Sequence, residues 1–239
     1  MIQYENISRN YGRKEAVKRL DLTVRPGELL AFLGPNGAGK TTTIKMTVGL
    51  LRPGTGTVRV CGIDVSSNPR EAAGHLGYVP DQPYLYEKLT GREFLQFIVD
   101  MRGMDRSLAQ ERISQQIEAF SLEEFIDDLT ERYSHGMKQR VVFASALLHS
   151  PDVLIVDEPM VGLDPKSMRM VKDLLRDQAA QGTTVLMSTH TLDVVEEIAD
   201  RIGILDRGEL LFLGTLKELK QRLPAEDASL ERLYLDMTG

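Results

Sequence analysis

A glycine-rich segment of eight residues constrains this chain more than any other feature of its sequence. It reads Gly34-Pro35-Asn36-Gly37-Ala38-Gly39-Lys40-Thr41. The apolar run before it, residues 29–33, predicts a strand buried on both faces, and the spacing in residues 41–50 predicts a helix. The segment fits the pattern G-x-x-x-x-G-K-[ST] completely, and a chance match in a chain of this length has a frequency of about 1%. A strand, such a loop and a helix in this order form a cradle for phosphate groups.

The chemistry of this loop follows from its backbone and from the side chains at its end. Glycines allow successive N–H groups to point inward, where they meet phosphate oxygens at the N-terminus of the helix. Lys40 is predicted to reach the β- and γ-phosphates of a nucleotide, and the Thr41 hydroxyl to take one position around Mg²⁺. Thr42 completes the predicted nucleotide-binding set. The alternative, a glycine turn beside an ordinary helix lysine, is disfavoured because both flanking elements that the motif requires are predicted.

Two acidic residues, Asp157 and Glu158, close a second apolar run at residues 153–156. Ligands of doubly wound sheets lie at the carboxyl ends of the strands, so these acids are predicted to face the phosphate loop. We assign Asp157 to Mg²⁺ and Glu158 to the general base that takes a proton from the attacking water. Solvated acids at a strand end are the alternative, and the complete phosphate loop disfavours it.

Strands and helices alternate along most of the chain, which predicts an α/β fold with a mainly parallel sheet covered on both faces. Strands are predicted at residues 20–24, 29–33, 56–62, 76–79, 153–156, 184–188 and 202–205, and helices at 41–50, 141–148, 168–180 and 192–199. Between about residues 84 and 150 the apolar residues follow helical spacing, as in Phe94, Ile98 and Met101. This block is predicted to be a helical insertion.

Composition and charge limit the classes of function. The 239 residues are 42% hydrophobic and 27% charged, which is typical of a soluble globular protein with one large domain or two small ones. The 29 Lys and Arg residues against 35 Asp and Glu give a net charge of −6, which disfavours nucleic acid and anionic lipid as partners. The single cysteine, Cys61, excludes an internal disulfide and favours the cytosol.

No membrane segment or signal peptide is predicted. No apolar run reaches the roughly 18 residues that a membrane span requires. Glu5 lies where a signal peptide has a basic end. We therefore expect an intracellular protein that does not insert directly into a membrane.

A further segment precedes the predicted helix at 141–148 and reads Tyr133-Ser134-His135-Gly136-Met137-Lys138-Gln139-Arg140. Together with the phosphate loop and the acidic strand end, it resembles the signature of the ATP-binding-cassette (ABC) ATPases, and the likeness covers nearly all of the chain. The family consensus has glycine in place of His135 and usually glutamine in place of Met137, but exporter-type members commonly depart in this way. Without the family, this segment would be only a turn and a helix cap.

The resemblance implies roles for several residues outside the phosphate loop. The Ser134 hydroxyl and the Gly136 N–H are expected to cap the γ-phosphate of ATP bound to the other subunit of a head-to-tail dimer. His190 resembles the switch histidine that contacts the γ-phosphate, and it joins Lys40 and Glu158 as a predicted catalytic residue. Tyr11 resembles the aromatic residue that stacks on adenine, an interaction worth about 1–3 kcal/mol.

Two other segments also resemble family motifs. Residues 162–165, Gly-Leu-Asp-Pro, are similar to the loop through which the two subunits communicate. The family has a glutamine after Gly-Tyr-x-Pro that senses Mg²⁺, whereas here residues 77–80 are followed by Asp81 and then Gln82. Adjacent side chains of an extended segment point to opposite faces, so the sequence leaves open whether Asp81 or Gln82 has this role.

The fold that the resemblance implies is a P-loop NTPase of ABC type. It has a mainly parallel core sheet, an N-terminal antiparallel β subdomain and an inserted helical subdomain. We expect a single ABC ATPase domain over residues 1–239. Within it, the nucleotide-binding core with its β subdomain takes residues 1–83 and 151–220, the helical subdomain 84–150, and a short C-terminal helical tail 221–239, with a helix predicted at 229–236.

The function that the resemblance implies is ATP hydrolysis that powers transport, in the direction of efflux, by a separate membrane permease. The subunit is expected to dimerise around MgATP with an identical or paralogous subunit. Family members receive a short helix of the membrane protein at the region that here has Tyr84, Tyr86, Leu89 and residues 94–101. Most of these apolar residues are expected to belong to the core, and exposed docking by several of them is the alternative. Contact with the permease is expected to hold the protein at the inner face of the cell membrane. The alternative is a soluble ABC ATPase that assembles or remodels a protein complex without a permease.

Overall fold

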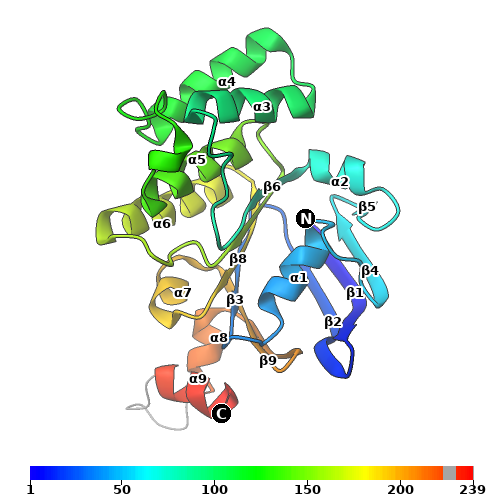
Figure 1. Ribbon diagram of the computed structural model, residues 1–239. Coiled ribbons are helices and arrows are strands. Elements are labelled where there is room, and N and C mark those ends of the chain that lie inside the picture. The colour runs from blue at the N-terminus through cyan, green and yellow to red at the C-terminus, as the bar shows by residue number, and fades with distance from the viewer. Residues whose placement is uncertain (223–229, 239) are drawn as a thin grey trace.

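Short apolar strands form the centre of the larger of two sheets. The computed structural model describes residues 1–222 and 230–238, and its larger sheet has the strand order β10-β9-β3-β8-β7-β6 (Figure 1). The strands are β3 (Leu29–Leu33), β6 (Leu76–Val79), β7 (Val153–Asp157), β8 (Thr184–Thr189), β9 (Arg201–Asp206) and β10 (Glu209–Gly214). All neighbours pair in parallel except β9 and β10. The predicted α/β fold with a mainly parallel core is confirmed.

The smaller sheet is antiparallel and has the order β2-β1-β4-β5. Its strands are β1 (Ile2–Tyr11), β2 (Lys14–Val24), β4 (Thr55–Val60) and β5 (Ile63–Asp64). The sequence did not indicate β1, because its pairing with β2 shifts register after Tyr4 and again after Ile7. These irregularities interrupt the alternation of buried and exposed residues on which strand prediction rests.

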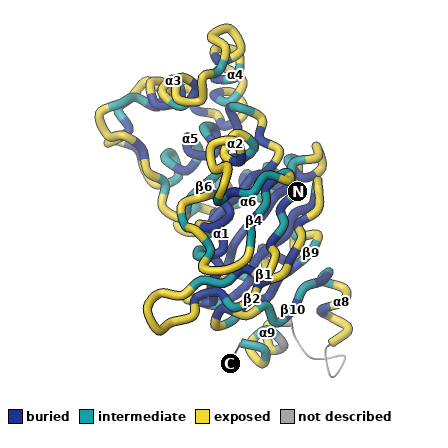
Figure 2. Tube along the Cα trace, turned by 90° about the vertical axis from the view of Figure 1, so that its right-hand side faces the viewer, coloured by how far each residue is buried: buried dark blue, intermediate teal, exposed yellow. Residues whose placement is uncertain are grey.

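The strand β3 separates two hydrophobic cores. Leu29, Ala31 and Leu33 pack on one face with residues of the helices, whereas Leu30 and Phe32 pack on the other with the smaller sheet. Both sets are almost completely buried because successive side chains of a strand point to opposite faces. Figure 2 shows buried residues along the strands and exposed residues on the outer helices.

Helices cover the sheet on the face away from the smaller sheet and extend beyond it. They are α1 (Lys40–Thr47), α2 (Pro69–Gly74), α3 (Gly91–Arg102), α4 (Arg106–Ala119), the 3₁₀ turn Thr130–Arg132, α5 (His135–Leu147), α6 (Pro165–Ala180), α7 (Leu192–Ile198), α8 (Leu216–Lys220) and α9 (Leu230–Thr238). The helices α1 and α2 are the exceptions, because residues of both pack in the core that is shared with the smaller sheet. The block from α3 to α5 forms the top of Figure 1.

Local signals explain where the helices of this block begin and end. Thr90 caps α3 reciprocally with Glu93, and Gly103 ends the helix in the left-handed conformation at φ 66°. Asp105 caps α4 by accepting hydrogen bonds from the backbone of Ser107 and Leu108. The insertion is therefore helical as expected. The exact subdomain boundaries stay predictions.

The C-terminal helix α9 lies below α8 in Figure 1. It covers most of the helix predicted at residues 229–236, whose first residue, Ser229, is outside the described residues. Within the described ranges, every helix is too short or too polar to cross a lipid bilayer.

A cavity of about 690 Å³ lies where α2, α3 and α5 meet the end of α1. Its walls include Leu50, Ile98, Met101, Arg102 and His149. The His149 Nε2–H donates to the carbonyl oxygen of Leu76 at 3.0 Å, and Nδ1 is buried with no hydrogen-bond partner among the described residues. Burial, with the nearby positive charge of Arg102, lowers the pKa of His149 to about 4.

This imidazole is expected to make the protein less stable in acid. The unfolded chain binds the proton near the ordinary pKa of 6.5 and the folded chain only near pKa 4, so the free energy of unfolding falls as pH drops through this window. Because the side chain is only partly buried, we expect a loss of about 1 kcal/mol between pH 7 and pH 5. Urea unfolding at several pH values between 7 and 5 measures this loss of unfolding free energy. The His149→Gln variant, which carries no titrating group there, should lose less stability than the parent; equal pH slopes would contradict the assignment.

Candidate active site

A cavity of about 260 Å³ lies beyond the carboxyl ends of the central strands β3 and β7. It is lined by residues of the phosphate loop, the smaller sheet and two strand ends: Tyr11, Lys14, Ala16, Pro35, Asn36, Gly37, Ala38, Gly39, Lys40, Thr41, Thr42, Asp81 and Glu158. The structure therefore brings together the loop, the adenine-stacking candidate and the candidate base, which are far apart in sequence.

The phosphate loop requires glycine at two positions for different reasons. Gly39 precedes α1 with φ 108°, and a Cβ there would lie 2.5 Å from the carbonyl oxygen of Ala16. A Cβ on Gly34 would lie 2.2 Å from the carbonyl oxygen of Leu205. At Gly39 a larger residue is excluded both by the positive φ and by the close carbonyl oxygen. At Gly34 it is excluded by lack of space alone.

Lys40 is buried at the bottom of the cavity, with 5% of its side chain exposed. Its Nζ donates to the carbonyl oxygens of Gly34 at 2.5 Å and Pro35 at 3.2 Å, and lies 3.4 Å from Oε1 of Glu158. The loop thus holds the ammonium in place through its own carbonyl groups. Phosphate oxygens carry more charge than carbonyl oxygens and form stronger hydrogen bonds with a cation.

Asp157 ends β7 and is fully buried. Its Oδ1 accepts hydrogen bonds from the Thr41 hydroxyl at 3.3 Å and from the Ser188 hydroxyl. Burial raises the pKa of Asp157, against the lowering effect of these two hydrogen bonds. The other oxygen, Oδ2, is buried without a partner in the described part of the chain. An unpartnered carboxylate oxygen beside a threonine hydroxyl is an oxygen donor set that fits Mg²⁺.

Glu158 follows Asp157 with φ 48°, a left-handed conformation that residues other than glycine adopt rarely. Its backbone N–H donates to Ser188, 3.2 Å from the carbonyl oxygen and 3.0 Å from the hydroxyl oxygen. These hydrogen bonds hold the unusual backbone in place. Such local strain is found most often at functional sites.

His190 completes a group with Lys40 and Glu158. It follows β8, half of its side chain is exposed, and its Nδ1 lies 3.0 Å from Oε2 of Glu158. The Glu158 carboxylate therefore contacts the lysine through one oxygen and the histidine through the other. The structure thus joins the three predicted catalytic residues through Glu158, although their individual roles stay predictions.

Tyr11 ends β1 at the rim of the cavity, with 48% of the residue exposed. The Arg9 guanidinium carbon lies 5.5 Å from the centre of its ring. A ring exposed at the rim is open to stacking on a planar base, and the adenine-binding role of Tyr11 stays a prediction. Sequence reasoning missed Lys14 and Ala16, which also line the cavity. They follow Tyr11 across the hairpin between β1 and β2, and only a prediction of β1 would have found them.

Asp81 lines the cavity, whereas Gln82 is absent from its described walls. The negative charge of Asp81 also contributes to raising the pKa of Asp157. The carboxylate accepts a hydrogen bond of 2.9 Å from the Gln82 backbone N–H. This geometry favours Asp81 for the role that the sequence left open, and the assignment stays a prediction.

Ser134 and Gly136 do not belong to this cavity; they lie at the N-terminus of α5, within the helical block (Figure 1). Ser134 is exposed, and its hydroxyl accepts a hydrogen bond of 3.3 Å from the Met137 N–H. The Met137 sulfur in turn accepts from the Ser134 N–H at 3.4 Å. His135 Nε2 lies 3.1 Å from the carbonyl oxygen of Val161. The segment is thus tied to the loop after Glu158 and presents a capped helix end outward.

Comparison with protein families gives a match to the model described as ABC transporter over residues 17–161. Among characterised proteins, the chain is 39% identical over 223 residues to the linearmycin resistance ATP-binding protein LnrL of Bacillus subtilis (strain 168). The match covers 93% of this chain and 72% of that protein.

Solved structures show the same fold. The chain superimposes on an ATP-binding subunit of an ABC transporter with a TM-score of 0.92 and 32% identity, over the full length of both chains. It matches the ATP-binding cassette MJ0796, a dimer in a post-hydrolysis state with ADP and Pi, with a TM-score of 0.79 and 26% identity. That match covers 90% of this chain and 99% of the other.

Replacement of Lys40 by alanine is expected to weaken ATP binding by about tenfold or more, because a hydrogen bond to a charged group contributes about 1.5–3 kcal/mol. Lys45→Ala is the matched control, since Lys45 is exposed on the same helix and lies outside the cavity. Isothermal titration with ATP measures both affinities. Unchanged affinity in Lys40→Ala, or equal losses in the two variants, would refute the role of Lys40.

Proposed function

Because the chain belongs to the ABC transporter family, we propose that it is the ATP-hydrolysing subunit of a membrane exporter. ATP hydrolysis itself is the activity of this family of cassettes. The observation that carries the proposal for this chain is the contact of Glu158 with both Lys40 and His190 beside a complete phosphate loop. This arrangement gives each predicted catalytic residue a position from which it can act.

The chain's own residues divide the reaction as follows. The loop N–H groups and the Lys40 ammonium bind the phosphates and offset the charge that develops on them. Glu158 takes a proton from the attacking water, because its carboxylate faces the cavity and is oriented by contacts at both oxygens. His190 orients this base through the contact of its Nδ1 with Glu158, and its proposed second role is to donate to a γ-phosphate oxygen. Tyr11 positions the nucleotide by stacking on the base.

The Mg²⁺ ion that this chemistry requires would be held by Thr41 and Asp157, with Asp81 nearby. Bound there, it supplies positive charge that stabilises the phosphate oxygens. The unpartnered Oδ2 of Asp157, and the 3.3 Å contact of the Thr41 hydroxyl with its Oδ1, support this placement.

A second subunit completes the nucleotide site in this proposal. Ser134 and the N-terminus of α5 are exposed and lie outside the chain's own cavity, which fits a role at the nucleotide of a partner subunit. ATP held between two subunits stabilises the closed dimer by mass action, and its hydrolysis removes this bridge. The dimeric MJ0796 cassette supports this assembly. An identical or a paralogous chain would serve equally.

A permease is proposed to dock on the face with α3. Of the residues expected there, Tyr84, Tyr86, Phe97 and Met101 are exposed, whereas Phe94 is buried. Met101 also lines the cavity of about 690 Å³ beside α2 and α5. The Tyr86 ring contacts the rings of Tyr84 and Phe97, and such a group of exposed apolar side chains is typical of a protein interface. Docking at this face would hold the subunit at the inner surface of the cell membrane.

Efflux is the proposed direction of transport, because the relative LnrL is a resistance protein. The alternative of a soluble remodelling ATPase is not favoured, since the matching family and structures are those of transporter subunits.

The Glu158→Gln variant is expected to bind MgATP and to accumulate as an ATP-bound dimer, while its turnover falls about 100-fold or more. The amide keeps the size of the side chain but accepts no proton. Size-exclusion chromatography with ATP and a phosphate-release assay measure the two effects. Glu196→Gln, an exposed position on α7, is the matched control. Near-normal turnover in Glu158→Gln would show that another residue is the base.

Replacement of Tyr84 and Met101 by serine should reduce recovery of a permease with the tagged subunit from detergent-solubilised membranes by about fivefold or more, because exposed anchor residues dominate such interfaces. ATP turnover of the isolated double variant should equal that of the parent. Leu108→Ser, on α4, is the matched control because Leu108 is also exposed but belongs to another helix. Full recovery of the permease with the double variant would place its docking surface elsewhere.

A further inference from the structure

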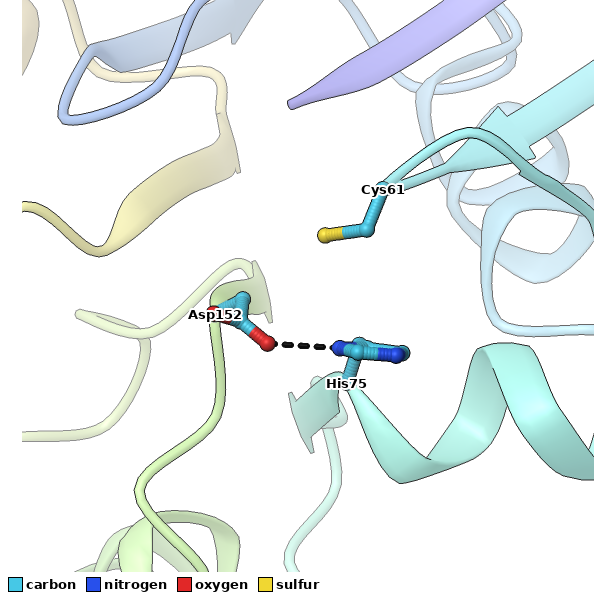
Figure 3. A group of neighbouring side chains, drawn as sticks. All are labelled: Cys61, His75 and Asp152. Carbon is cyan, nitrogen blue, oxygen red and sulfur yellow. Dashed lines mark hydrogen bonds and ion pairs between the residues drawn. The ribbon is translucent and has the colours of Figure 1, made fainter.

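Three side chains of different chemistry gather at a site that the ATPase chemistry does not use. They are Cys61, in the turn between β4 and β5; His75, directly after α2; and Asp152, before β7. The Cys61 Sγ, a ring nitrogen of His75 and a carboxylate oxygen of Asp152 all lie within 4.8 Å of one another. In Figure 3 the thiol and the carboxylate lie on the side of the imidazole that carries Nδ1.

The backbone on which each of these side chains stands is held by hydrogen bonds. The Cys61 N–H donates to the carbonyl oxygen of Met1 at 2.9 Å. The carbonyl oxygens of His75 and Asp152 accept from Val153 at 3.0 Å and Thr184 at 2.9 Å. The Met1 amino group also donates to the Thr184 hydroxyl at 3.1 Å, so hydrogen bonds connect the backbone at Cys61 with the strand end at Asp152. Fixed positions on regular elements are what a metal site requires of its scaffold.

The turn that carries Cys61 does not by itself select a cysteine. Cys61 and Gly62 both have positive φ, 50° and 84°, as in the tight two-residue turns that join antiparallel strands. Asn, Asp and Gly are the residues that such turns favour. The conformation directs the thiol toward His75 and Asp152 instead of toward solvent (Figure 3).

A thiolate sulfur, an imidazole nitrogen and a carboxylate oxygen form a mixed donor set that Zn²⁺ accepts. We propose that Cys61, His75 and Asp152 together bind one Zn²⁺-type divalent ion, with water at the remaining position. Tetrahedral ligands about 2.0–2.3 Å from an ion lie roughly 3.5 Å apart. The His75 Nδ1 and the Asp152 carboxylate are now hydrogen-bonded at 2.6 Å, so the ion would replace this contact.

To bind the ion, the Asp152 carboxylate must move away from His75, and Asp152 is the more exposed of the two side chains. Asp152 has 63% of its side chain exposed, against 39% for His75. Rotation of this carboxylate opens the space without moving a strand. The occupied site would join the β4–β5 turn of the smaller sheet to the β6–β7 edge of the larger one. Because none of the three residues lines the nucleotide cavity, the ion would stabilise the fold without taking part in hydrolysis.

Titration of the reduced, metal-free full-length chain with Co²⁺ tests the proposal. Cys61 is the only cysteine, so a near-ultraviolet charge-transfer band from sulfur to cobalt reports this site alone. We expect the band to saturate at one Co²⁺ per chain and to disappear when Zn²⁺ is added. Zn²⁺ should also raise the unfolding temperature of the parent chain.

Variants of each ligand separate a metal site from a simple ion pair. Cys61→Ser should lose the band and the thermal shift while keeping its unfolding temperature without metal. His75→Gln and Asp152→Asn should each lower the Co²⁺ affinity by about tenfold or more, because a ligand is removed. The control variant His149→Gln replaces a histidine outside the cluster and should bind Co²⁺ like the parent.

Three results would overturn the proposal. The first is the absence of the band at millimolar Co²⁺. The second is saturation at one Co²⁺ per two chains, which would mean a bridge between two Cys61 thiolates. The third is unchanged affinity in His75→Gln, which would leave His75 and Asp152 as an ion pair with Cys61 as a neighbour.

Discussion

The contact between Glu158 and Lys40 is the interaction on which the site depends, because it joins two segments that are far apart in sequence. The parallel register makes it possible: Leu33 of β3 pairs with Thr189 of β8, and Ser188 of β8 pairs with Asp157 of β7. Three strands therefore end at the same level. The segments that follow them bring the lysine, the glutamate and His190 into one group.

The same strand ends carry two residues whose burial or backbone conformation is unfavourable for stability. Asp157 is buried with one oxygen lacking a partner in the described part of the chain, and Glu158 adopts a left-handed backbone. Both cost stability, and both are stabilised by Ser188, which donates its hydroxyl proton to Asp157 and accepts from the Glu158 N–H. In the proposed function a metal ion and a nucleotide use these groups, and that use would give the local cost a functional reason.

In the proposed function, two separate surfaces of the chain contact nucleotide, and the reaction is divided between subunits. The phosphate loop and the base lie in one cavity, whereas Ser134 lies at an exposed helix end in the helical block. The exposed residues near α3 lie on that block as well. A movement of the block relative to the sheet would thus change the proposed partner contact and the proposed permease contact together. The proposed metal site instead joins two parts of the core to each other.

Much of this could be predicted from local sequence, and the rest depended on contacts that only folding makes. The loop from Gly34 to Thr41 and the acids at 157 and 158 were identifiable because each motif consists of consecutive residues with a recognisable pattern. The strand β1 could not be identified, because register shifts interrupt the alternation of buried and exposed residues along it. Lys14, which follows β1 and lines the cavity, was missed for the same reason. The choice between Asp81 and Gln82, and the meeting of Cys61 with His75 and Asp152, rest on distances between separate elements. The sequence motifs by themselves determine which chemistry the chain can perform. Strand order and register decide which side chains meet, and only the tertiary structure shows these, because they depend on contacts between segments that are distant in sequence.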